Sequence, residues 1–126
     1  LDRVIERPYV PDSSLNSKLA ECIHAYSERK QKAAEAKCEE FLTRPESDEH
    51  KSIASTILGV IYDEKGRYEE SISYLKRALN YDPKNVYAYY DLTLAFKHAG
   101  RIAEAKETIS KARELFPNDT KVNGLA

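Results

Sequence analysis

Two stretches of this chain follow the same plan at a fixed spacing. Residues 66–85 read GRYEESISYLKRALNYDPKN, and residues 100–119 read GRIAEAKETISKARELFPND. Both begin with Gly-Arg, carry apolar residues at helical spacing and place a proline at the same offset. The second copy therefore follows the first by 34 residues (100 minus 66). A constant repeat length indicates equivalent units that stack, because a single helix pair cannot bury its apolar face alone.

Apolar residues recur at intervals of three and four over most of the chain, which predicts amphipathic helices. The predicted helices cover residues 15–26, 33–42, 53–62, 68–79, 89–96 and 102–116. No run of alternating apolar and polar residues is long enough to indicate a strand. We therefore predict an all-α fold, an α-solenoid of antiparallel helix pairs in tandem.

Small residues and breaks in the pattern indicate how the pairs are joined. Gly59 and Ala78 leave room for neighbouring helices to approach closely. Gly66 and Gly100 permit a tight turn inside each pair, because glycine adopts backbone angles that other residues avoid. The charged run SDEHK at residues 47–51 is expected to be a solvated loop.

Composition excludes several classes of function. The chain has 126 residues, enough for one domain, and its formal net charge of -1 gives no field that would attract nucleic acid or a membrane surface. No apolar run approaches the roughly 18 residues of a membrane span. No nucleophile–base pair, phosphate-binding loop or metal-ligand spacing is present, so we expect no catalytic residue, no metal and no cofactor. The lack of methionine, even at position 1, indicates an excised or processed piece of a longer protein.

Cys22 and Cys38 are the two cysteines of the chain. They form no CxxC pair and have no histidine at zinc-finger spacing, so a zinc site is not expected. They indicate either two small apolar residues on facing helices or, in an oxidising compartment, a disulfide.

The two repeats resemble the tetratricopeptide repeat (TPR) family, whose 34-residue pattern is W-x2-L-G-x2-Y, then A-x3-F, A and P. Matching residues occur in order through residues 52–85 (Leu58, Gly59, Tyr62, Leu75, Ala78, Pro83) and 86–119 (Tyr89, Leu92, Phe96, Ala105, Ile109, Ala112, Pro117). The departures are Ser55 for the aromatic residue, Ser71 for alanine and Thr93 for glycine. Residues 16–50 lack this core and a turn glycine, so we expect a degenerate first repeat there.

The resemblance implies a right-handed superhelix and a domain map. We expect residues 1–14, which contain Pro8 and Pro11, to be an extended lead-in, residues 15–119 to form the TPR domain, and residues 120–126 to begin a truncated capping helix. Because about one turn of helix cannot cover the last pair, the helix at 102–116 is expected to expose part of an apolar stripe. That stripe would contain Ile102, Ala105, Ile109, Ala112 and Phe116.

TPR domains bind other proteins, and the first helices of successive pairs line a concave groove. The resemblance places the candidate groove residues at Ile53, Thr56, Val60, Asp63, Glu64, Tyr87, Tyr90, Asp91, Leu94, Lys97 and His98. In the first repeat the equivalent positions are Lys18, Glu21, Ala25, Glu28 and Arg29.

The chemistry of these positions narrows the partner. One TPR subset grips the C-terminal carboxylate of chaperones with a Lys/Asn/Lys/Arg clamp. Here Tyr87 and Asp91 stand at a lysine and an arginine position, and Asp91 would repel a carboxylate. The tyrosine and apolar side chains instead favour a peptide or amphipathic helix of another protein. The alternative is an assembly element that forms a homo-oligomer or docks within a larger multidomain protein.

Overall fold

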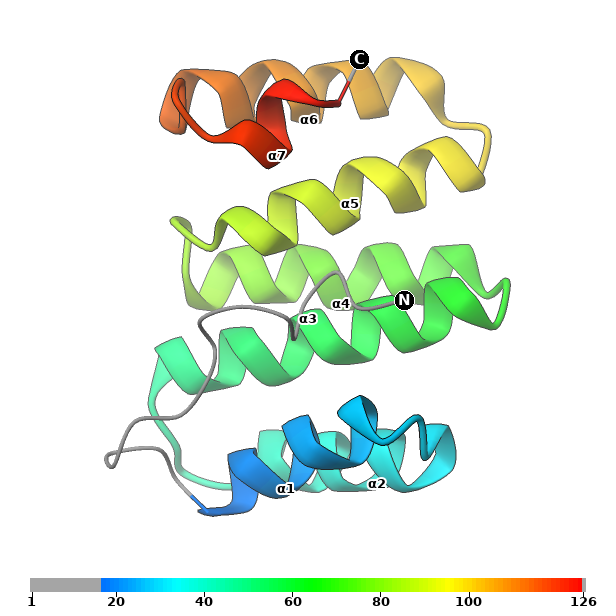
Figure 1. Cartoon of the computed structure of the whole chain (residues 1–126), viewed down its shortest axis with the longest axis vertical. Helices are drawn as coiled ribbons and strands as arrows, with labels where there is room; N and C mark the ends of the chain where they lie inside the picture. Colours follow the sequence, from blue (N-terminus) through cyan, green and yellow to red (C-terminus); the bar gives the residue numbers. More distant parts are fainter. Residues whose placement is uncertain (1–16, 126) are drawn as a thin grey trace.

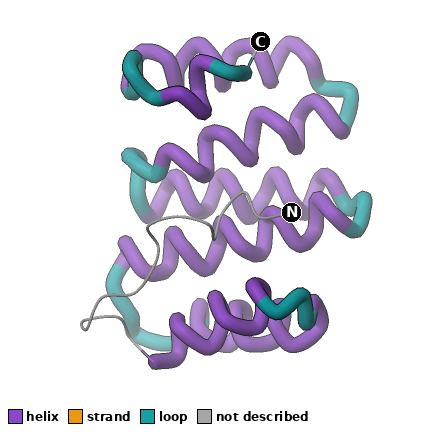
Figure 2. The backbone as a smooth tube through the Cα atoms, viewed as in Figure 1, coloured by secondary structure: helices purple, strands orange, loops and turns teal. Residues whose placement is uncertain are grey.

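The computed structural model describes residues 17–125, and the predicted lead-in at residues 1–14 lies outside this range. The described residues form seven helices and no strand (Figures 1 and 2). The helices are α1 (Ser17–Ser27), α2 (Gln31–Leu42), α3 (Asp48–Glu64), α4 (Tyr68–Tyr81), α5 (Val86–His98), α6 (Ile102–Leu115) and α7 (Thr120–Asn123).

The helices form antiparallel pairs that stack in chain order along the long axis of the molecule (Figure 1). α1 packs with α2, α3 with α4 and α5 with α6, and each pair also contacts the next. Successive first helices contact each other directly, α1 with α3 and α3 with α5, whereas the backbones of α2, α4 and α6 stay apart from one another. The arrangement confirms the predicted all-α solenoid.

A close approach between helices lies where α4 crosses Gly59 of α3. A Cβ atom added to Gly59 would stand 2.5 Å from the Cγ atom of Leu75, closer than side chains pack in real proteins. Beside this contact, the Ser71 hydroxyl donates a hydrogen bond to the Gly59 carbonyl oxygen at 2.6 Å. Gly59 therefore allows the close packing that the sequence predicted, and serine in place of alanine at position 71 adds a hydrogen bond across the pair.

Each pair turns through one residue in the left-handed backbone region. Gly66 (φ 79°) precedes α4 and Gly100 (φ 77°) precedes α6, as predicted. Arg29 adopts the same conformation before α2, with φ 61°. The first pair thus lacks the glycine but keeps the turn, and Arg29, Gly66 and Gly100 occupy equivalent positions in the three pairs.

Residues 48–51 of the charged run are helical and Ser47 caps the helix, so the predicted loop is wrong. Ser47 is the N-cap of α3, and its hydroxyl accepts a hydrogen bond from the His50 backbone N–H at 3.2 Å. Asp48 and Glu49 lie in the first turn, where the helix dipole stabilises negative charge. The same residue types that favour a solvated loop are also those that begin a helix.

The last pair is covered more fully than the sequence predicted. Of the five residues of the predicted stripe, the three central ones, Ala105, Ile109 and Ala112, are buried because α5 packs against that side of α6. Although α7 is a single turn, Val122 and the following Leu125 are also buried. Of the remaining stripe, Ile102 is 49% exposed and Phe116 is half-buried.

Cys22 of α1 and Cys38 of α2 form a disulfide. Both residues are fully buried, as expected for small residues on facing helices, and they are bonded rather than free. Disulfides persist in oxidising environments. The bond joins the two helices of the degenerate pair, where the TPR motif residues are missing.

We predict that removing this disulfide lowers the free energy of unfolding by about 3 kcal/mol, because it closes a loop between residues 16 apart and restricts the unfolded chain. The measurement is denaturant unfolding of wild-type chain refolded with and without a reductant. The control is the double variant Cys22→Ala, Cys38→Ala, whose stability should not respond to the reductant. An equal response in both proteins would contradict the prediction.

We also predict that Arg29→Gly stabilises the chain by about 0.5 to 1 kcal/mol. Glycine relieves the steric cost of a left-handed conformation, and this gain exceeds the added entropy of the unfolded chain. The reverse substitution, Gly66→Arg, should lower stability. The urea unfolding midpoints of both variants, compared with that of the wild type, test the two predictions. A loss of stability in Arg29→Gly would show that this turn is not strained.

Candidate protein-binding site

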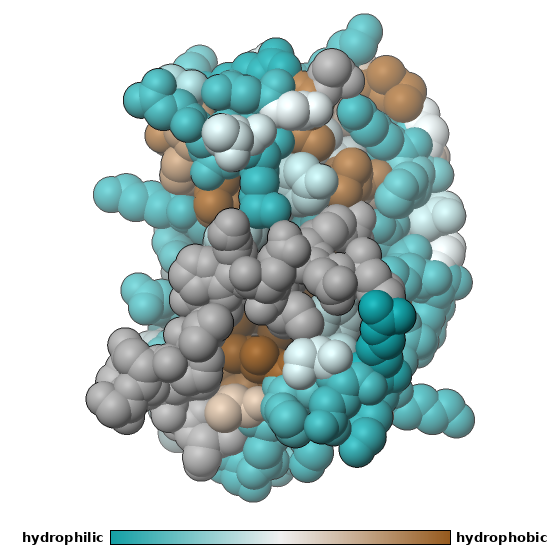
Figure 3. Space-filling view, viewed as in Figure 1, coloured by the Kyte–Doolittle hydropathy of each residue, from teal (hydrophilic) through white to brown (hydrophobic). Residues whose placement is uncertain are grey.

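The first helices form one face of the molecule, with α1, α3 and α5 lying in front of α2, α4 and α6 in Figure 1. Figure 3, drawn from the same side, shows apolar patches separated by polar groups. We call the surface formed by α1, α3 and α5 the first-helix face. All the candidate groove residues on α3 and α5 follow helical spacing, which places them along this face.

The α3 residues of the first-helix face differ in exposure. Ile53 is 8% exposed, and Thr56 and Val60 are fully buried. Glu64 is exposed at the end of the helix, where its carboxylate accepts a hydrogen bond from the Tyr26 hydroxyl at 3.2 Å. That bond links α1 to α3 across the face.

The α5 residues form the more accessible part of the face. Tyr87, Tyr90, Leu94 and Lys97 are half-buried, and His98 is exposed. Asp91 differs from its neighbours because it is only 1% exposed. The partly exposed residues therefore follow one another along α5 at the i, i+3 and i+7 spacing typical of a helix that contacts a partner.

A pocket of about 250 Å³ opens between the first turns of α3 and α5. Ile53 and Tyr87 line it, together with polar residues of the α3 N-terminus and of the turn before α5. Two of the predicted groove residues from different repeats are thus brought to the same hollow.

Lys121 of α7 borders the first-helix face, and sequence reasoning missed it. Its ammonium lies 5.7 Å from the ring centre of Tyr87 and 5.4 Å from that of Tyr90. Such cation–π contacts hold the two rings beside α7. The lysine follows Thr120 in the segment assigned only to a truncated cap, so no pattern in the sequence pointed to it.

His98 and Asp63 connect the far ends of α5 and α3. The His98 Nδ1 atom lies 2.9 Å from Oδ1 and 3.0 Å from Oδ2 of Asp63. The Asp63 side chain is 2% exposed, whereas that of His98 is 46% exposed. This contact fixes the orientation of the imidazole at the rim of the face.

Thr56 serves the structure rather than the surface. Its hydroxyl donates to the Ser52 carbonyl oxygen at 2.8 Å and accepts from the Asn85 amide nitrogen at 3.2 Å. The same amide donates to the Ser52 hydroxyl at 2.9 Å, while the Asn85 side-chain oxygen caps α5 by accepting from two backbone N–H groups. This buried network joins the start of α5 to α3.

The first-repeat positions fit the first-helix face less well. Ala25 is buried, and Lys18 and Glu21 are paired with each other at 3.9 Å. Glu28 and Arg29 lie beyond the end of α1 at Ser27, in the turn that leads to α2. The first and second repeats are not separated by the regular 34 residues. Groove positions carried over from the later repeats therefore do not fall on the matching positions of the first repeat.

Within residues 17–125, no group of three or more His, Cys, Asp or Glu residues is placed to hold a metal ion. None of the described helices combines the length and apolar character needed to cross a membrane.

The fold and its repeated pairs define the chain as an all-α helical-repeat solenoid. The sequence profile of the tetratricopeptide repeat matches residues 64–126, which is half of the chain. The chain therefore belongs to the tetratricopeptide repeat family. Domains of this family usually serve as protein–protein interaction scaffolds and are typically non-catalytic.

Two solved structures show the same fold. One is the C-terminal TPR-containing domain of a Plasmodium falciparum protein described as FK506-binding, with a TM-score of 0.71 and 23% identity over 85% of this chain and 80% of that one. The other is a mutant O-GlcNAc transferase of Thermobaculum terrenum, with a TM-score of 0.71 and 26% identity over 81% of this chain. The match covers only 19% of the transferase chain.

We predict that Asn85→Ala lowers the free energy of unfolding by about 2 kcal/mol. About half of the loss comes from the helix cap and about half from buried hydroxyls that lose a partner. Thermal and urea unfolding would measure it, with Asn118→Ala, at an exposed turn position, as the control. Equal stability of both variants would show that the buried network contributes nothing.

Proposed function

We propose that the first-helix face binds an apolar or amphipathic segment of a partner protein, with Tyr87, Tyr90 and Leu94 as its main anchors. The observation behind this proposal is that these three side chains lie half-buried in a row on α5, next to the pocket that Ile53 and Tyr87 share. A partly covered aromatic side chain can bury further area with little loss of rotamer freedom, so tyrosines are frequent anchors at protein interfaces.

The remaining groove residues provide the rim of the proposed site. Lys97 and His98 follow Leu94 on α5, and Glu64 lies opposite at the end of α3. Lys121 stands over the two tyrosine rings and limits where the partner can lie. An amphipathic segment suits this mixture, because its apolar side would meet the tyrosines and its polar side the rim.

The proposed partner is not a chaperone tail of the carboxylate-clamp type. Tyr87 and Asp91 occupy two positions where that clamp needs cations, and Asp63 and Glu64 add negative charge on α3. The face therefore lacks two of the cations with which the clamp grips a terminal carboxylate, whereas an apolar segment does not need them.

We predict that the double variant Tyr87→Ala, Tyr90→Ala weakens partner binding at least about 10-fold, or about 1.4 kcal/mol, because two anchors lose their buried area. The ligand would be a helical peptide selected from a displayed random library on the wild-type chain, with Kd measured by calorimetry. The control is Tyr81→Ala at the end of α4, outside this face, which should bind like wild type.

The same titration with a peptide ending in acidic residues and a free carboxylate should show no binding above a scrambled control. Unchanged affinity of the double variant, with its helical circular dichroism intact, would mean that the partner does not use this face. A monomer–dimer equilibrium that responds to the two tyrosine substitutions would instead support the assembly alternative.

A further inference from the structure

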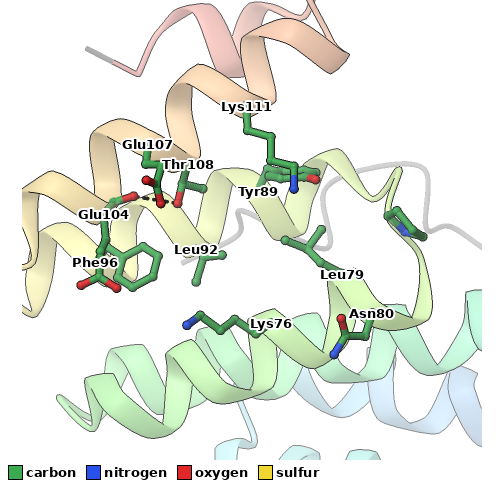
Figure 4. Close-up of a pocket in the computed structure, with 11 residues that line it drawn as sticks. Lys76, Leu79, Asn80, Tyr89, Leu92, Phe96, Glu104, Glu107, Thr108 and Lys111 are labelled. Atoms are coloured by element: carbon green, nitrogen blue, oxygen red, sulfur yellow. Dashed lines mark hydrogen bonds between the residues drawn. The ribbon is translucent and has the colours of Figure 1, made fainter.

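The second helices leave a pocket of about 320 Å³ between α4 and α6, on the opposite side of the repeats from the first-helix face (Figure 4). Leu79, Leu92 and Phe96 form its apolar base. Lys76 of α4 and Thr108 and Lys111 of α6 stand around it. This volume lies at the lower end of the range for small-ligand sites, roughly 300 to 1,000 Å³.

The position of the pocket follows from how the helices pack. α4 and α6 both contact α5 but their backbones stay apart, so the space between them must be filled by side chains or left open. The equivalent space one repeat earlier lies between α2 and α4, which both contact α3 and whose backbones also stay apart. The two spaces can therefore be compared residue by residue.

Between α2 and α4 the space is filled by Tyr74. Its ring stacks on that of Tyr62, with centroids 5.4 Å apart and planes 6° from parallel. Its hydroxyl donates to the Glu39 carboxylate at 3.2 Å. Burial, aided by the charge of Glu39, raises the pKa of Tyr74, which keeps this hydroxyl a donor.

The turn residues fix which positions correspond. Tyr74 stands eight residues after Gly66, and Thr108 stands eight residues after Gly100, the equivalent turn glycine. By the same offset of 34 residues, Phe96 corresponds to Tyr62. Thr108 therefore replaces the filling tyrosine, and its hydroxyl turns back to donate to the Glu104 carbonyl oxygen at 2.8 Å (Figure 4). The pocket is the space that an aromatic ring occupies one repeat earlier.

The charges around the pocket also differ between the repeats. Lys76 stands ten residues after the turn residue Gly66, and Glu39 stands ten residues after the equivalent turn residue Arg29. The two positions therefore correspond. In the later repeat a lysine stands where the earlier repeat has the carboxylate that accepts the Tyr74 hydrogen bond. The Lys76 ammonium lies 5.7 Å from the Phe96 ring centre. Among the described residues, neither Lys76 nor Lys111 forms an ion pair with a carboxylate.

The carboxylates at the pocket balance these lysines only in part. Glu104 is held by two hydrogen bonds from Arg101, at 2.6 and 2.8 Å, which satisfy both of its oxygens. Glu107 is the other carboxylate there and is exposed on α6. Lys76 adds to the larger effect of Arg101 in lowering the pKa of Glu104, so Glu104 offsets part of the lysine charge. The two lysines still outnumber Glu107, the carboxylate that Arg101 leaves free, which favours an occupant with a negative charge beside its ring.

We propose that this pocket is a second docking site, which takes an aromatic side chain of a partner protein that has acidic residues next to it. The ring would stack on Phe96 in the place that Tyr74 takes against Tyr62. The neighbouring carboxylates would pair with Lys76 and Lys111, and the Lys76 ammonium would leave the Phe96 ring to do so. The site is separate from the first-helix face, so one chain could bind two segments.

The test uses three capped tripeptides as probes, followed by NMR titration of the whole chain. The first has phenylalanine between two glutamates, the second phenylalanine between two lysines, and the third leucine between two glutamates. The first should shift the amide signals of residues near Phe96 and Thr108 and bind about fivefold more tightly than either of the others.

Two substitutions locate the binding. Thr108→Tyr should fill the pocket with the chain's own ring, abolish binding of the first probe and raise the thermal midpoint by about 3 °C. Thr108→Ser is the matched control, keeps the pocket open and should bind normally. Lys76→Gln should reduce the preference for flanking glutamates without removing the binding of phenylalanine.

The proposal is overturned if the lysine-flanked probe binds best, if the shifted signals lie elsewhere, or if Thr108→Tyr binds as wild type does. Should Thr108→Tyr fail to fold, the Lys76→Gln titration decides, because an unchanged preference for flanking glutamates would rule out the charge recognition. A negative result for this pocket would not contradict the proposal for the first-helix face, because the Tyr87→Ala, Tyr90→Ala variant is tested with separate ligands.

Discussion

The contact of Gly59 with Leu75 sets the spacing on which the rest of the stack depends. Every residue of α3 from Ser52 to Asp63 is buried, because α1, α2, α4 and α5 all pack around this helix. A side chain at position 59 would push α4 away through its collision with Leu75. It would also break the Ser71 bond to the Gly59 carbonyl. Since α4 in turn supports α5, a displacement there would pass to the next repeat.

Much of this fold could be predicted, because helical periodicity and turn glycines are local signals. Gly66 and Gly100 marked two turns, and the 34-residue offset placed two pairs in register. The first pair was harder to predict, since Arg29 adopts the same turn without the residue type that announces it. A disulfide joins the two helices of this pair. Whether it forms depends on how closely α1 and α2 approach, which the local sequence pattern does not show.

The sequence predicted which side of each helix the candidate site residues occupy, but not how exposed their side chains are. Helical spacing shows which side of α5 a residue occupies, and Tyr87, Tyr90 and Leu94 do lie along one side. It does not show what the neighbouring elements cover, so Thr56 became part of a buried network with Asn85. Lys121 reaches the tyrosine rings only because α7 folds back on α5, a contact that no periodicity encodes.

The two faces of the solenoid follow from one asymmetry in packing. Successive first helices touch, so their side of the stack is closed by helix–helix contacts, whereas the second helices stand apart on either side of a first helix. A stack that is closer on one side than on the other must curve, and its wider side must be filled by side chains. Tyr74 fills one such space, and Thr108 leaves the next one open. A single residue type in each repeat therefore decides whether the second-helix side is a packed surface or a pocket, while the helices themselves keep the same arrangement.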